Sequence, residues 1–97
     1  HEKELEYQLK ALGIGEQSLP PDHPDIVVWR SNIALTYARM EDFIRANEYM
    51  RRALESAERS MRGHPDLEWY RWAAKEMERC AQCQERGEPF DNPFNQM

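Results

Sequence analysis

The fold is decided by residues 22–61, DHPDIVVWRSNIALTYARMEDFIRANEYMRRALESAERSM. After the turn at residues 22–25, apolar residues recur at helical spacing as far as Tyr37. Glu41 and Asp42 interrupt this pattern, and a second amphipathic segment begins at Phe43. The stretch therefore predicts two antiparallel helices joined by a short break, which is a helical hairpin.

The rest of the chain repeats parts of this hairpin. Aligned with itself at an offset of 42 residues, the chain places residues 6–7 on 48–49, residues 11–12 on 53–54, and residues 16 and 18 on 58 and 60. After a one-residue deletion in the linker, the His-Pro-Asp triplet at 23–25 falls on the triplet at 64–66. Self-similarity at a fixed period is typical of helical repeat proteins.

We expect an all-α chain of about four helices in antiparallel hairpins. The predicted helices span residues 2–18, 24–39, 43–61 and 65–86. Pro24 suits the first turn of its helix because its missing N–H would be unpaired there anyway, and Asp22 is the expected N-cap. The apolar stripe of the first helix includes Tyr7 and Ile14. Gly87 is expected to end the last helix.

The composition excludes several classes of protein. The net charge is -5, with basic and acidic residues interleaved, which argues against the basic surface of a nucleic-acid-binding protein. No apolar run approaches the roughly 20 residues needed to cross a bilayer. The two cysteines are too few for a secreted disulfide scaffold, so we expect a cytoplasmic protein without membrane insertion.

The hairpin resembles a tetratricopeptide repeat. The residues at the small and aromatic positions of that family are Ala34, Tyr37, Phe43, Ala46, Met50 and Ala53. The period of 42 residues exceeds the usual ~34. Together with the phrase Leu-Pro-Pro-Asp-His-Pro-Asp at 19–25 and Arg-Ala-Leu-Glu at 52–55, this period resembles the kinesin light chain type of repeat. The resemblance spans residues 7–70.

The resemblance implies a short array in residues 1–86, followed by an irregular tail at 87–97. We expect a half repeat at 1–21, a full repeat at 22–61 and a capping helix at 64–86. Glu4 departs from the family, which has a small residue at that position. Because such arrays generally need about three units, the chain is either a piece of a longer array or pairs with another copy. We favour a homodimer.

In this family the first helix of each hairpin lines a concave groove that binds a protein or peptide partner. The register implies that the groove is formed by Ser31, Asn32, Leu35, Arg39, Trp69, Trp72 and Glu76. An alternative is that both tryptophans pack on the preceding hairpin. The function implied is that of a protein–protein interaction or scaffold module. The second candidate is a homo-oligomerisation module whose open end helices pair with another copy.

The tail contains Asn92, Pro93 and Phe94. This tripeptide resembles the ligands of EH-domain endocytic adaptors, in which Asn-Pro forms a tight turn and the phenylalanine fills a pocket. Two alternatives remain open. The tail docks on the chain itself or on another copy, or it has no binding role.

No catalytic or metal-binding set emerges from the sequence. Cys80 and Cys83 lie three residues apart near a predicted helix end, whereas zinc requires four ligands and a redox pair belongs at a helix start. The His-Pro-Asp motif also occurs in J-domain co-chaperones. Because its two copies here recur in the repeat register, we interpret both as linkers between helices. We therefore expect no enzyme activity, no metal and no cofactor.

Overall fold

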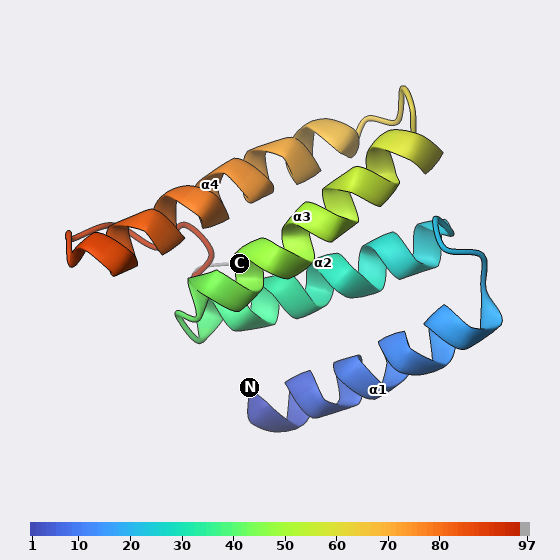
Figure 1. Cartoon of the computed structure of the whole chain (residues 1–97), viewed down its shortest axis with the longest axis horizontal. Coiled ribbons are helices and arrows are strands. Elements are labelled where there is room, and N and C mark those ends of the chain that lie inside the picture. Colours follow the sequence, from blue (N-terminus) through green and yellow to red (C-terminus); the bar gives the residue numbers. More distant parts are fainter. Residues whose placement is uncertain (96–97) are drawn as a thin grey trace.

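The computed structural model describes residues 1–95, which form four helices and no strand. These are α1 (Glu2–Ser18), α2 (Pro24–Arg39), α3 (Phe43–Ser60) and α4 (Leu67–Arg86). The predicted all-α fold is confirmed (Figure 1). None of these four helices is both long and apolar enough to cross a membrane. The last two residues of the predicted tail, Gln96 and Met97, lie outside the described residues.

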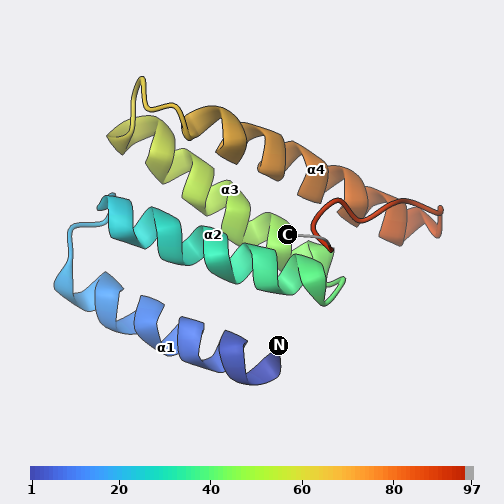
Figure 2. The same ribbon diagram turned by 180° about the vertical axis from the view of Figure 1, so that it is seen from behind.

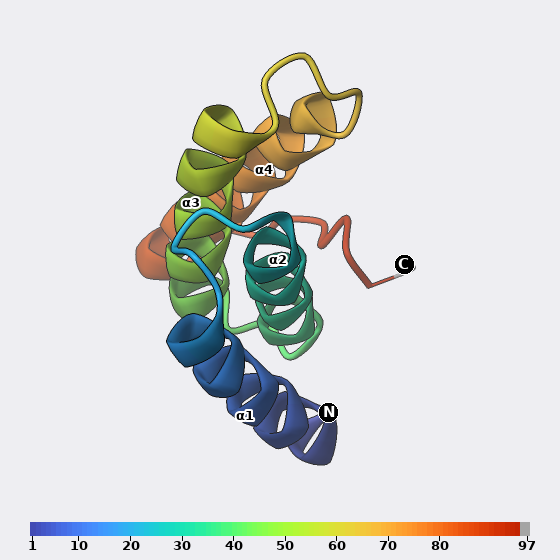
Figure 3. The same ribbon diagram turned by 90° about the vertical axis from the view of Figure 1, so that its right-hand side faces the viewer.

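Each helix packs antiparallel against the next one in the chain, as Figures 1 and 2 show from opposite sides. The most extensive packing joins α2 to α3 and α3 to α4, and α1 packs against α2. Figure 3 shows that the C-terminal tail lies on the side of α2 that faces away from α3. The tail therefore lies beside the C-terminal part of α2, where Asn92 contacts Ala38.

The core of the hairpin uses the small and aromatic positions predicted from the sequence. The Tyr37 and Tyr49 rings stack with their centroids 5.7 Å apart. Small side chains allow α2 and α3 to approach closely, and larger apolar side chains fill the space between them. The fully buried members of this core include Ile33, Ala34, Phe43, Ala46, Met50 and Ala53.

The turn before α2 differs from the prediction at its cap. His23, not Asp22, is the N-cap, and its Nδ1 accepts a hydrogen bond from the Asp25 backbone N–H at 3.1 Å. Asp22 instead accepts two hydrogen bonds from the Arg59 guanidinium, at 2.9 and 3.0 Å. These bonds hold the pKa of Asp22 below its ordinary value. Asp22 thus ties the linker to the end of α3.

The second His-Pro-Asp triplet has the same side-chain geometry but starts its helix later. His64 Nδ1 accepts from the Asp66 backbone N–H at 3.1 Å, as His23 does in the first copy. The predicted start at Pro65 is wrong by two residues. Leu67 N–H donates to His64 O, as Ile26 N–H does to His23 O, but the first copy adds at once the four-residue bond from Val27 N–H to His23 O. The four-residue ladder of α4 begins only with Tyr70 N–H on Asp66 O.

The outward side of α1 is more exposed than its predicted stripe suggested. Tyr7 and Ile14 are 78% and 68% exposed, because α1 packs on α2 alone and buries only one side. The contact between the two helices is partly polar. The buried Thr36 hydroxyl lies 3.0 Å from Glu4 Oε1 and 2.9 Å from Gln8 Oε1.

Candidate functional site

One side of α2 faces away from α3 and carries several of the residues predicted for the groove. Helical spacing places Val28, Ser31, Leu35 and Ala38 on this side. Val28 is 43% exposed and Leu35 is half-buried. Ser31 is buried, and its hydroxyl donates to Val28 O at 2.8 Å. This side of α2 therefore offers an apolar surface and few free polar groups.

α4 continues this surface. At the 41-residue offset that superposes the two His-Pro-Asp triplets, Trp69, Trp72 and Glu76 occupy the places of Val28, Ser31 and Leu35. Trp72 is 40% exposed. Trp69 is half-buried and meets the Tyr70 ring edge-on at 5.4 Å. Glu76 is held by Arg79 at 2.7 Å.

We call the surface formed by Val28, Leu35 and Ala38 of α2 with Trp69 and Trp72 of α4 the A-face. Burial raises the pKa of Tyr70, the residue behind Trp69. Tyr70 is buried, and its hydroxyl lies near Ser31 of α2.

The predicted tail motif lies on the A-face. Phe94 is fully buried, and the centroid of its ring lies 5.6 Å from that of Trp72. Asn92 Nδ2 donates to the Ala38 carbonyl at 2.9 Å. The tail therefore touches α2 and α4 at once, although residues 38 and 92 are far apart in the sequence.

Two of the predicted groove residues lie on the other flank of α2, toward α1. Asn32 lines a hollow of about 190 Å³ together with Tyr7, Gln8, Ala11 and Trp29. Arg39 Nη1 lies 4.0 Å from Glu4 Oε1. Arg39 Nε is buried and has no hydrogen-bond partner among residues 1–95. Leu35, Trp69 and Trp72 thus belong to the A-face. Ser31, which is buried, and Glu76, which is paired with Arg79, lie on the same sides of α2 and α4. Asn32 and Arg39 lie beside α1.

Val28 and Ala38 were not among the predicted groove residues. Val28 could have been found from the repeat register, because Trp69 falls on it at the 41-residue offset. Ala38 takes part through its backbone carbonyl, one of the last four of α2 that have no partner within the helix. No side-chain pattern signals such a carbonyl.

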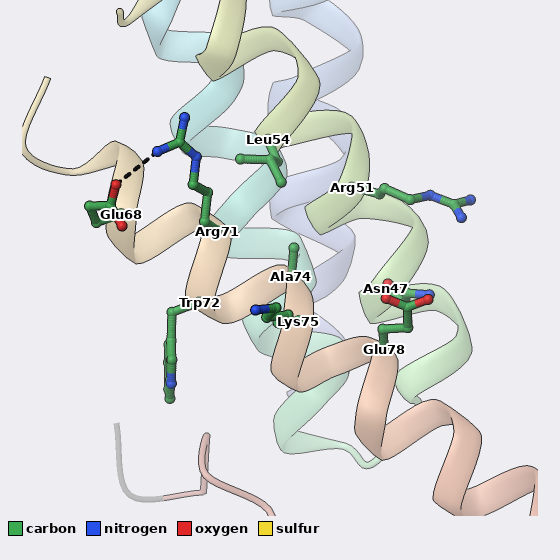
Figure 4. A pocket seen from close by; sticks show the side chains of 9 residues that line it. All are labelled: Asn47, Arg51, Leu54, Glu68, Arg71, Trp72, Ala74, Lys75 and Glu78. Atoms are coloured by element: carbon green, nitrogen blue, oxygen red, sulfur yellow. Dashed lines mark hydrogen bonds and ion pairs between the residues drawn. The ribbon is translucent and has the colours of Figure 1, made fainter. Parts of the chain in front are cut away.

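A further hollow, of about 600 Å³, lies between α3 and α4, and Trp72 is one of the residues that line it (Figure 4). Its α4 residues Arg71, Lys75 and Glu78 fall at the 41-residue offset on Arg30, Ala34 and Tyr37. In the hairpin, Ala34 and Tyr37 are buried and Tyr37 stacks on Tyr49 of α3. Charged residues at these places do not favour the packing of another helix. Figure 4 also shows Trp72 pointing away from Asn47, Arg51 and Leu54.

The cysteine pair has no partners for metal chemistry. Both thiols are free, Cys80 is fully buried, and burial raises its pKa. Within residues 1–95, no group of three or more His, Cys, Asp or Glu side chains is placed to hold a metal ion.

Comparison with known proteins adds one match. A family model described as tetratricopeptide repeat matches residues 1–59. Searches of curated proteins and of solved structures found no match.

Proposed function

The chain belongs to the tetratricopeptide repeat family, and we propose that it binds a peptide or a segment of a partner protein on the A-face. Proteins of this family generally mediate protein–protein interaction on a scaffold that is not itself catalytic. The A-face is the candidate binding surface because it combines residues of α2, the first helix of the hairpin, with residues of α4, the corresponding helix of the next unit.

A single observation carries the proposal. Val28 of α2 and Trp72 of α4, two large apolar side chains of the A-face, are 43% and 40% exposed. Trp69 and Leu35 flank them and are half-buried. Tryptophan next to partly desolvated apolar neighbours is the composition that is enriched in binding hot spots.

A peptide library displayed on phage and selected against the purified chain tests this proposal. We expect the selected peptides to lose at least about tenfold in affinity for the W72A variant, since a hot-spot tryptophan contributes about 2 kcal/mol or more. The matched control is Arg52→Ala, at an exposed position of α3. Equal affinities of all selected peptides for the native chain and the W72A chain would overturn the assignment.

A second candidate function, homo-oligomerisation, is favoured by a different surface. α1 exposes Tyr7 and Ile14, and a hollow of about 460 Å³ beside them is lined by Ala11 and Ile14 of α1 and Trp29 of α2. At the 42-residue offset Tyr7 corresponds to Tyr49, which stacks on Tyr37 inside the hairpin. We propose that a second copy covers this side of α1.

Light scattering across micromolar concentrations tests this second candidate. We expect the native chain to dimerise and a chain with Tyr7→Ser and Ile14→Ser to remain monomeric. A native chain that stays monomeric over the whole range contradicts the dimer and leaves the A-face proposal intact.

The finer assignments are also proposals. The kinesin light chain subtype is supported by the two His-Pro-Asp turns, in which the histidine accepts the same backbone hydrogen bond. We divide the chain into a half repeat (1–21), a full repeat (22–61), a capping helix (64–86) and a tail (87–97), with the charged outer flank of α4 in support. The free cysteines support a reducing compartment such as the cytoplasm.

A further inference from the structure

The tail has a defined conformation. Asn92 Oδ1 accepts a hydrogen bond from the Phe94 backbone N–H at 2.9 Å, which makes a turn closed by the asparagine side chain across Pro93. Asn95 N–H lies 3.5 Å from the Asn92 carbonyl. Proline fixes its own φ, so the turn loses little conformational freedom when it docks.

This turn and Phe90, two residues before it, together present three side chains to the body of the protein. The asparagine amide donates at 2.9 Å to Ala38 O, a carbonyl near the C-terminal end of α2 that also accepts from Glu41 N–H at 3.0 Å. The Phe94 ring is 0% exposed and lies against Trp72 of α4. Phe90 meets the Phe43 ring edge-on, with centroids 5.4 Å apart.

Contacts at the C-terminal end of α4 direct the tail toward α2. Gly87, at a φ of 70°, ends α4 in the left-handed conformation, and Glu88 N–H donates to Cys83 O at 2.9 Å. Gln84 Nε2 donates to Glu41 O in the α2–α3 turn. These contacts direct the segment after α4 back toward α2, as Figure 2 shows.

We infer that the A-face, together with Phe43 at the start of α3, recognises peptides of the pattern Phe-x-Asn-Pro-Phe, and that residues 90–94 of the chain itself are the resident occupant. The inference rests on the proposed function and names its ligand class. The asparagine is required twice, as the closing side chain of the turn and as the donor to Ala38. The second phenylalanine is required to fill the space beside Trp72.

A partner peptide must therefore displace the tail. A segment tethered by a short linker competes at an effective concentration in the millimolar range. The native chain consequently binds such peptides more weakly than a chain whose tail has been released. The peptide and the tail compete for the same site, so a peptide binds only when the tail is released.

The test uses a fluorescent peptide of residues 88–95, EPFDNPFN, and the full-length chain with Phe94→Ala. We expect fluorescence anisotropy to show binding to the F94A chain at least about tenfold tighter than to the native chain. A peptide in which alanine replaces its second phenylalanine is the control and should not bind. An N92A chain provides a second way of releasing the tail, and circular dichroism checks that both variants remain helical.

Two results would overturn the inference. The peptide fails to bind either helical tail-released chain, or it binds native and released chains equally. If library peptides of other sequences still lose affinity for the W72A chain, only the ligand class fails and the A-face proposal stands. If neither kind of peptide depends on Trp72, both proposals fail.

Discussion

Gly15 shows how a single residue sets the distance between α1 and α2. It is buried, and a Cβ built on it would lie 2.0 Å from Cζ3 of Trp29. Glycine in a helix interior costs about 1 kcal/mol against alanine, so by propensity alone this position weakens α1. The indole of Trp29 occupies the space that a side chain at position 15 would fill. Its packing against α1 offsets the low helix propensity of glycine.

We predict that Gly15→Ala lowers the free energy of unfolding by about 1–3 kcal/mol, since the added methyl group overpacks the Trp29 contact. Gly13→Ala is the matched control. No atom lies within 4 Å of a Cβ at Gly13, so its replacement should stabilise the chain by up to about 1 kcal/mol. Urea denaturation followed by circular dichroism measures both. A stabilising Gly15→Ala would show that Trp29 does not pack on α1 as described.

The two cysteines differ in environment although they are three residues apart. Cys80 is fully buried with a raised pKa, whereas Cys83 is half-buried. Because the thiolate is the reactive form, we predict that iodoacetamide at pH 8 alkylates Cys83 first and reaches Cys80 only when the chain unfolds. Peptide mass spectrometry of partly labelled protein separates the two sites. Equal labelling rates in the folded chain would contradict the packing of α4.

At the scale of elements, the helices were predictable from the sequence, but the N-cap of α2 and the start of α4 were not. The ends of α1 and α2 follow from periodicity and from the prolines and charges that interrupt it. The N-cap of α2 does not follow, because Asp22 and His23 are both polar and adjacent. Asp22 is drawn to Arg59, which lies in another helix. The contact with Arg59 thus determines which of the two residues caps α2, and the local sequence pattern does not show that contact.

The Asp22–Arg59 pair makes part of the stability depend on pH. The folded pKa of Asp22 is lowered by its hydrogen bonds to Arg59, so the pair contributes fully above the unfolded value of about 3.9. That contribution is lost as the pH falls through the lower folded value. We predict that Asp22→Asn reduces the pH dependence of the melting temperature below about pH 4. The control is Asp91→Asn at an exposed tail position, which should leave the profile unchanged. A native profile reproduced by Asp22→Asn would mean that the pair does not form.

The two ends of the array are chemically different. The outward side of α1 is apolar at Tyr7 and Ile14, whereas the outer flank of α4 carries Arg71, Lys75 and Glu78. A polar outer surface is typical of a terminal repeat. The substitution of charged residues at packing positions of α4 was visible in the sequence, and the structure places these residues at the open hollow.

At the scale of the whole molecule, the docking of the tail is the feature that the sequence predicts least. Asn92-Pro93-Phe94 is too short a motif to indicate its partner, and one of its contacts is a backbone carbonyl of residue 38. The sequence also did not show how the predicted groove residues lie relative to α1. The repeat register places Trp69 and Trp72 on the same surface as Leu35, but only the assembled helices show that Asn32 turns toward α1.

The most direct test of the A-face is an NMR titration of the ¹⁵N-labelled F94A chain with a peptide that binds it. We predict that the amide and indole shifts that change most belong to Val28, Leu35, Ala38, Trp69 and Trp72, with little change at Arg52 on α3. Shift changes that cluster on α1 and α3 and leave the Trp72 indole unmoved would contradict the account.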